Sequence, residues 1–584
     1  MRKIVTEKPF PANSSLGMLL NRQQAGFDTT LSGLYGSARS FLISALFAQL
    51  ATPLVAVLAT EKEAREFYRD CLVFSGEASV MHYPAWDTVT ADFFTVQKEI
   101  ELARLKVLSS LASERRCLVI TSLPALVQKI IPKGLFLEYI RTLSLGDTLD
   151  RDEMVRHLLQ GGYVKQTLVE GKGEFSARGH ILDIYPPDAP GPYRVELIGD
   201  EVESIRLFDP ANQRSNREVL EFQVIPAREL VLTDRHSQQA IRNIRSRANE
   251  LELPRQVKDH LTDAIDNNLL SSVNPMYLSL FYRPGSTASN VDGELMFHAD
   301  NFFDYCSEGE LFFTDDPSAL GRSLEDLGNT VSRVLIQARH ENKFFLDAEC
   351  FLLSQEELQY SMAAFRLIRY EELHFHTPTS GPDFPVDPSV VHCRTESTAL
   401  IKTEVTAPEG ILSPLVDMIR QDLAAGHLVI FMCPGREDVQ RMTHLLQGYG
   451  LQPDAHDPEW SFIYKVLNHG NGGRLVLREG KVISGFRFAE MKLTVLAEED
   501  IFGRKQTRRL ARPAREGYFL KSFSELSEGD FIVHKDHGIG VYRGLQKMAV
   551  ADIENDYLLI EYAEKDRLYI PVDRLDQIQR YIGP

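Results

Sequence analysis

The alternation of short apolar runs with amphipathic segments across residues 53–121 constrains the fold more than any other feature. Apolar, β-rich runs at 53–60, 79–83 and 117–121 are separated by segments at 61–74 and 97–111, whose apolar residues recur at helical spacing. Parallel strands need such helical crossovers, and the helices then cover both faces of the sheet. The sequence therefore predicts an α/β fold built on a mostly parallel sheet.

Changes of periodicity divide the chain, whose 584 residues allow for roughly three to five domains. Apolar and polar residues alternate with period two in the region after residue 139, between glycines and prolines, and short strands without helices fill 524–584. These patterns predict a small α+β insert and a C-terminal β-barrel. The expected boundaries are 1–138 and 231–395 for the two parts of the first α/β domain, 139–230 for the insert, 396–503 for a further α/β domain of unassigned role, 504–523 for a basic linker and 524–584 for the barrel.

A phosphate loop with altered chemistry is indicated at residues 33–40. Gly33 and Ser40 match the pattern G-x-x-x-x-G-K-[ST], but Ala38 replaces the second glycine and Arg39 replaces the lysine. A β-carbon hinders the close approach of backbone to phosphate, and an arginine fork is bulkier than a lysine ammonium. The prediction is a degenerate nucleotide loop that holds neither ATP nor magnesium. Its residues are Gly33, Gly36, Ala38, Arg39 and Ser40.

A second degraded motif lies at residues 310–316, where an apolar run ends in Asp315 and Asp316 in the form of a Walker B element. Aspartate at 316 stands where an active ATPase of this type usually has glutamate. Two degraded elements in this order favour a decayed nucleotide-binding fold; the alternative is that both are coincidental apolar strands with polar ends. A further α/β region is indicated by the apolar run at 428–433 and the helical segment at 437–447.

Composition limits the partners and the compartment. The net charge of −18 and the isoelectric point of about 5.4 leave only a local patch or a separate domain for DNA binding. The basic run at 504–515 is expected to be a solvated linker, with weak DNA contact as the alternative. Six cysteines without a CxxC pair fit a reducing cytoplasm and give no zinc site. Neither a signal peptide nor an apolar run of about 18 residues is present, which predicts a cytoplasmic protein without a membrane span.

Three stretches carry a family resemblance. Residues 81–94 (MHYPAWDTVTADFF) and 173–186 (GEFSARGHILDIYP) resemble segments of the bacterial transcription-repair coupling factors and are also shared with the excision-repair protein UvrB. The C-terminal stretch that begins at 526–540 (LSEGDFIVHKDHGIG) resembles the CarD-like, Tudor-like module that binds RNA polymerase. This combination is specific to the coupling factors, and the resemblance covers essentially the whole chain, most weakly over 240–400.

The resemblance implies a degenerate RecA/UvrB-like nucleotide-binding domain, an insert that recruits UvrA and a Tudor/CarD-like barrel that docks on the β subunit of RNA polymerase. The ATP-driven DNA translocase of the family would follow the barrel, so this chain is expected to be a DNA-repair adaptor and not an enzyme. One alternative is an ATP-dependent, UvrB-like damage-loading enzyme, which would need intact Walker elements. Another is a CarD-type transcription regulator, which leaves residues 1–523 unexplained.

In the insert, the resemblance implies UvrA contacts at four residues: Phe175, Arg178, Arg194 and Arg206. Arg178 is the strongest candidate, because arginine and aromatic side chains are enriched in the hot spots of interfaces. The alternative is that Arg178 only pairs with a local glutamate such as Glu174 or Glu196.

In the terminal module, the polymerase contact is expected at Leu545, Lys547 and Met548, just past a predicted strand at 539–542. The resemblance matches Met548 to an apolar contact position, although methionine is also common in cores. Seven basic against twelve acidic residues in 524–584 favour a protein partner over DNA. A last set is expected to form turns and not a metal site: His534, Asp536 and His537.

Overall fold

A computed structural model describes residues 14–76, 79–86, 89–92, 98–231, 233–266, 273–282, 299–372, 389–398, 413–454, 466, 472–498, 529, 531–534, 538–550, 553–562, 567–571 and 578–580. The chain divides into two compact units, Met1–Arg504 and Lys505–Pro584. The basic run at 504–515 lies outside the described residues, as do Asp536 and His537.

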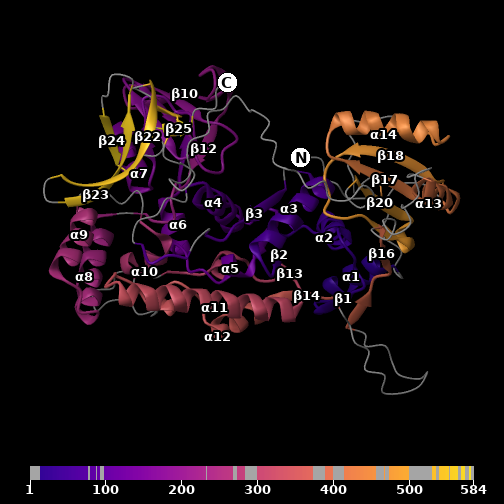
Figure 1. The fold of residues 1–584 in the computed structure, drawn as a ribbon. Coiled ribbons are helices and arrows are strands. Elements are labelled where there is room, and N and C mark those ends of the chain that lie inside the picture. Colours follow the sequence, from indigo (N-terminus) through magenta and orange to yellow (C-terminus); the bar gives the residue numbers. More distant parts are fainter. Residues whose placement is uncertain are drawn as a thin grey trace. The chain divides into compact units, whose positions relative to one another are not determined.

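A seven-stranded sheet organises the first unit (Figure 1). Its strands, in spatial order, are β15 (Val390–His392), β1 (Thr29–Ser32), β14 (Arg366–Glu371), β13 (Leu311–Thr314), β2 (Leu54–Leu58), β4 (Leu118–Ser122) and β3 (Val80–Tyr83). Every pair of neighbours is parallel, which confirms the predicted α/β class with a parallel sheet. The strands of this sheet come from two stretches of the chain, 29–122 and 311–392. The residues between these stretches form an insertion, which leaves the sheet after β4 and returns at β13.

Strand β2 contributes to a hydrophobic core on each face of this sheet. Val55 and Val57 belong to one core, together with residues of α4 (Lys98–Ala112). Ala56 belongs to the other core, together with residues of α1 (Ser15–Gln24), α2 (Ala38–Gln49) and α3 (Glu61–Ser75). A strand that is buried on both faces reads as a continuous apolar run, which explains the pattern at 53–60.

The inserted segment contains a six-stranded sheet of β11 (Ser215–Glu218), β10 (Glu201–Phe208), β9 (Tyr193–Ile198), β8 (Ile181–Ile184), β7 (Glu174–Arg178) and β6 (Val164–Lys165), in that order. Its neighbours are antiparallel except β6 and β7. Beside it, β5 (Arg141–Ser144) pairs with β12 (Glu221–Val224). Met154 and Leu158 of α7 (Arg151–Gln160) pack into the core on one face of the sheet, which explains the period-two pattern.

Further helices complete this part of the first unit: α5 (Leu123–Leu126), α6 (Lys133–Tyr139), α8 (Asp234–Glu250), α9 (Arg255–Asp266), η2 (Pro275–Tyr277), α10 (Leu278–Phe281), η3 (Phe302–Tyr305), α11 (Pro317–His340), η4 (Ala348–Cys350) and α12 (Gln355–Ala363). Within the described ranges, no helix has both the length and the apolar composition that crossing a bilayer requires.

A second sheet of the first unit consists of β16 (Thr395–Ser397), β19 (Phe486–Phe488), β20 (Leu493–Ala497), β17 (Leu428–Cys433) and β18 (Arg474–Glu479), in that order. β17 is parallel to β18 and β20, while β19 is antiparallel to β16 and β20. The strand expected at 428–433 and the helix expected at 437–447 are present as β17 and α14 (Arg436–Gly448), with α13 (Ser413–Ala424) before them. Phe486 of β19 and Phe41 of α2 lie in one core, with ring centroids 5.6 Å apart.

The second unit contains five strands in the order β24 (Arg567–Pro571), β23 (Ile553–Glu561), β22 (Gly538–Val550), β21 (Phe531–His534) and β25 (Ile578–Arg580). All neighbours are antiparallel. Among the described residues no pairing joins β24 to β25, so the predicted barrel is not observed in this part of the chain.

Strand β22 also differs from the prediction, because it continues far beyond the expected range of 539–542. Its register with β23 shifts between Tyr542 and Leu545. Gly544, with φ of +96°, lies at this shift and supplies a backbone conformation that other residues rarely adopt. The segment expected to follow the strand is therefore part of it.

Candidate protein-binding surfaces and the phosphate loop

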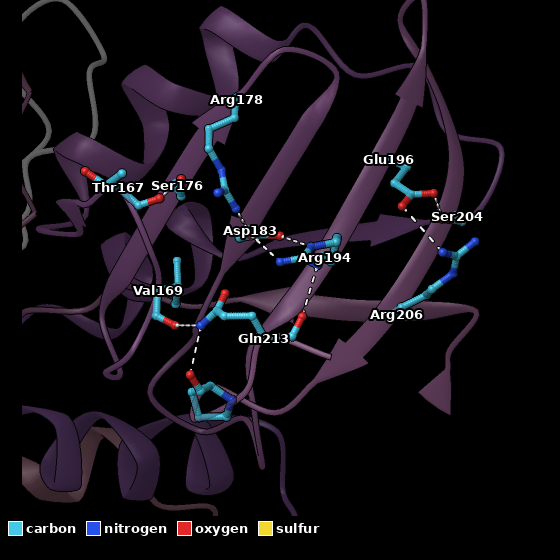
Figure 2. Close-up of polar contacts among 11 residues, drawn as sticks. Thr167, Val169, Ser176, Arg178, Asp183, Arg194, Glu196, Ser204, Arg206 and Gln213 are labelled. Atoms are coloured by element: carbon cyan, nitrogen blue, oxygen red, sulfur yellow. Dashed lines mark hydrogen bonds and ion pairs between the residues drawn. The ribbon is translucent and has the colours of Figure 1, made fainter. Parts of the chain in front are cut away.

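One face of the six-stranded sheet carries the three arginines predicted for UvrA binding (Figure 2). Arg194 lies opposite Asp183 on one side and opposite Arg206 on the other, in direct strand register. Arg178 lies two residues along β7 from Ser176, the register partner of Asp183, and therefore projects from the same face. This outer face is opposite the one that packs against α7.

Asp183 is the centre of the outer face. Its carboxylate accepts from Arg194 Nε at 2.8 Å and Nη2 at 3.0 Å, and from Arg178 Nη2 at 3.0 Å. The side chain of Asp183 is 0% exposed, whereas that of Arg178 is 44% exposed. The hydrogen bonds to Asp183 raise the pKa of Arg194 above its ordinary value, and the ring of Phe208 lies 4.6 Å from its guanidinium carbon. Asp183 thus holds one arginine tightly and orients a second one that remains accessible.

Arg206 makes a separate set of ion pairs. Its guanidinium lies 3.4 Å from a carboxylate oxygen of Glu196 and 3.5 Å from one of Glu218. Ser204 also donates to Glu196, at 2.9 Å. Glu196 therefore pairs with Arg206 and not with Arg178, while the carboxylate of Glu174 accepts from backbone amides of its own turn, including that of Gly171 at 2.8 Å. The local partner of Arg178 is Asp183, an alternative that the sequence reasoning did not include.

Phe175 lies on the opposite face from the arginines. Its side chain is 0% exposed and belongs to the core of the inserted sheet, together with Leu182 and Val195. The expected surface role for Phe175 is therefore not met in the structure: the side chain stabilises the sheet from within. Asp183 was not predicted; the aspartate in the otherwise apolar β8 (ILDI) is the sequence signal that could have revealed it, because a buried carboxylate requires a charged or hydrogen-bonding partner.

The segment predicted to be a degenerate phosphate loop, residues 33–40, begins after β1 and runs into α2, the position that such a loop has in a nucleotide-binding fold. Arg39, in place of the lysine, pairs with Asp315 at the end of β13, with Nη1 and Oδ1 2.7 Å apart. The guanidinium carbon also lies 4.8 Å from the ring centroid of Tyr370. Burial raises the pKa of the Asp315 carboxyl, and the nearby arginine partly offsets this effect. An ion pair thus joins the two segments predicted to be degraded motifs.

The other polar residues of the two motifs also have internal partners. Ser40 Oγ donates to Ser37 O at 2.9 Å and to Asp70 Oδ2 at 2.8 Å. Asp316 caps α11, accepting from the amides of Ser318 and Ala319 at 2.9 and 3.2 Å. Within the described part of the chain, no group of three or more His, Cys, Asp or Glu side chains could hold a metal ion.

In the second unit, β22 contains all three residues predicted to contact RNA polymerase. Leu545, Lys547 and Met548 lie opposite Leu558, Asp556 and Asn555 of β23 in the backbone register. The structure gives the backbone positions of these three residues in the strand, whereas their side chains are not described.

Two family models match the chain. The UvrB interaction domain matches residues 142–230, the segment with the arginine-bearing sheet, and the CarD-like/TRCF RID domain matches residues 526–582. The chain is thus defined as a protein that joins a UvrB interaction domain to a CarD-like, RNA-polymerase-interacting domain.

Curated relatives agree with this combination. The chain is 30% identical to the transcription-repair-coupling factor of Myxococcus xanthus over 575 residues, which make up 97% of this chain and 46% of the relative. It is 26% identical to that of Bacillus subtilis over 565 residues, 95% of this chain and 45% of the relative. The chain therefore spans about half the length of the curated relatives that it matches. The resemblance found in the sequence is confirmed: this chain is a relative of the transcription-repair coupling factors and corresponds to their N-terminal part.

Proposed function

We propose that the chain is an adaptor in transcription-coupled DNA repair, which docks on the β subunit of RNA polymerase and recruits UvrA. The observation that carries the proposal is the presence of both interaction domains in one chain that is similar to transcription-repair-coupling factors over 97% of its length. The function resides in protein binding, and the residues described here are assigned no catalytic step.

The UvrA-binding surface is proposed on the outer face of the inserted sheet, with Arg178 as its main contact. Asp183 fixes the direction of the Arg178 guanidinium while much of the side chain stays exposed. An arginine fork that is already oriented loses less side-chain entropy when it binds a carboxylate or carbonyl of a partner. Arg206, which is 37% exposed, is proposed as a flanking contact, and Arg194 as a support for Asp183.

Arg178→Ala is expected to weaken UvrA binding by about thirtyfold or more, because truncation of an arginine hot spot costs about 2 kcal/mol or more. The measurement is the Kd for purified UvrA by calorimetry or surface plasmon resonance. Arg156→Ala is the matched control: Arg156 is exposed on α7, which packs against the other face of the sheet. Equal Kd values for the wild-type chain and Arg178→Ala would place the UvrA surface elsewhere.

The polymerase contact is proposed at residues 545–548 of β22. Met548→Arg puts a charge at the proposed apolar contact and is expected to weaken binding of the chain to the polymerase β subunit at least about tenfold. Met548→Leu, which conserves an apolar side chain of similar volume, should bind like the wild type. Circular dichroism of both variants shows whether the β-sheet is retained. A folded Met548→Arg chain that binds with wild-type affinity would contradict the assignment of this site.

A further inference from the structure

The phosphate loop is occupied by other parts of the same chain. The amide of Tyr35 donates to Thr395 Oγ1 at 2.9 Å, and the amide of Ser37 donates to Ser484 O at 3.4 Å. In a working phosphate loop, backbone amides of this segment point at the phosphates. Here at least two of them are hydrogen-bonded to residues that lie far along the sequence.

The turn before β19 makes most of these contacts. The amide of Ser484 donates to Ser37 Oγ at 3.2 Å, and the amide of Ile483 donates to Asp70 Oδ1 at 3.0 Å. Asp70 is 1% exposed, and its other carboxylate oxygen accepts from Ser40. A β-carbon on Gly36 would lie 2.0 Å from Ser484 Oγ, so Gly36 makes room for the turn.

On the opposite side, the chain that leaves β15 closes over the start of the loop. Thr395 Oγ1 donates to Gly33 O at 2.8 Å, and a β-carbon on Gly33 would lie 2.2 Å from Cys393 O. Gly33, which matches the nucleotide-binding pattern, therefore also has a packing reason to be glycine. Its φ of +74° adds a conformational reason.

We propose that the former phosphate loop is an intramolecular docking site, occupied by the turn at Ile483–Ser484, which fixes the second α/β sheet to the first and excludes nucleotides. Beside these hydrogen bonds, the rings of Phe41 and Phe486 add an apolar contact between the two sheets. Ser15 adds a further link at the same junction, because its amide and hydroxyl donate to Glu490 Oε2 at 3.0 and 2.8 Å. This inference does not depend on the proposed partners of the chain.

The first test measures hydrogen exchange at the backbone amides of Ile483 and Ser484 in the full chain. Both are expected to be protected in the wild type, and Asp70→Ala is expected to accelerate the exchange of Ile483 at least about tenfold. Glu61→Ala is the matched control: this carboxylate accepts from Ala85 N, just after β3, and from Ser122 Oγ at the end of β4, and no described contact joins it to the turn. Gly36→Ala gives a second test if Asp70→Ala does not fold: its β-carbon would clash with Ser484 and should accelerate exchange of the Ser484 amide. Amides that exchange freely in the wild type would overturn the proposal.

The second test restores the motif. The double variant Ala38→Gly/Arg39→Lys recreates the pattern G-x-x-x-x-G-K-[ST] within the occupied loop. Calorimetric titration with Mg·ATP is expected to show no micromolar binding for this variant or for the wild-type chain, because Ser484 and Thr395 occupy the amides of the loop. Micromolar affinity of the restored variant would show that the turn does not block the site and would refute the proposal.

Discussion

Glu229→Ala is expected to destabilise the first unit by about 3–5 kcal/mol, because it leaves a buried guanidinium without its carboxylate partner. Arg104 of α4 and Glu229 form an ion pair in which both side chains are 0% exposed. Arg104 Nη1 also donates to Pro84 O at 2.9 Å and to Gln128 Oε1 at 2.8 Å. This pair connects the helix before β4 to the chain that returns from the inserted sheet, so its loss affects a junction between two parts of the unit.

The change can be measured with an intrinsic probe. The ring of Trp86 lies 5.3 Å from the guanidinium carbon of Arg104, and the chain has two tryptophans. In a Trp460→Phe background, Trp86 fluorescence during urea unfolding reports on this junction. The midpoint for Glu229→Ala is expected to fall by about 1 M or more.

Two further substitutions calibrate the result. Glu229→Gln can still accept a hydrogen bond, so it should lose less stability than Glu229→Ala. Arg255→Ala, at a side chain that is 92% exposed, should change stability by no more than about 0.5 kcal/mol. If Glu229→Ala unfolds at the same urea concentration as Arg255→Ala, the buried pair does not have the energetic role assigned to it.

Local periodicity was sufficient to predict the strands and helices that are buried on a regular pattern. The ranges expected at 53–60, 61–74 and 117–121 agree with β2, α3 and β4 to within two residues at every end. Strands β1, β14 and β15 were not predicted, because they mix polar and apolar residues, such as Arg366 and Arg369 in β14. Their positions depend on pairing between distant segments, as in the parallel register of Thr29 with Ile368, which no local pattern encodes.

The alternation of side chains between the two faces of a strand could have shown that the predicted contact residues do not share one surface. Phe175 and Arg178 lie three positions apart on β7, so their side chains project from opposite faces. That rule excludes Phe175 from the surface that carries Arg178, as the structure shows. The pairing of Asp183 with two arginines depends on the order and register of β7, β8 and β9, and the sequence does not specify those before the strands are assembled.

Asp183→Ala is expected to lower both the stability of the inserted sheet and its affinity for UvrA. Removing the carboxylate takes away three charge-assisted hydrogen bonds: two from Arg194, whose side chain is 17% exposed, and one from Arg178. The loss of stability is expected to be about 3 kcal/mol, at the lower end of the range for broken buried pairs because Arg178 is partly solvated. Binding to UvrA should also fall, although by less than in Arg178→Ala, because the Arg178 side chain remains but its guanidinium is no longer oriented.

Stability and binding can be separated by combining two measurements on the same variants. Arg178→Ala should lower the affinity for UvrA while it leaves the unfolding midpoint of the inserted sheet nearly unchanged, because Asp183 keeps its two contacts with Arg194. Asp183→Ala should lower both, and Asp183→Asn, which can still accept a hydrogen bond, should lie between the wild type and Asp183→Ala. If Asp183→Ala binds UvrA with wild-type affinity, the outer face of this sheet is not the recruiting surface, whatever the cost to stability. If it loses binding but not stability, the orientation of Arg178 by the buried Asp183 is supported, and the stabilising role assigned to its ion pairs is contradicted.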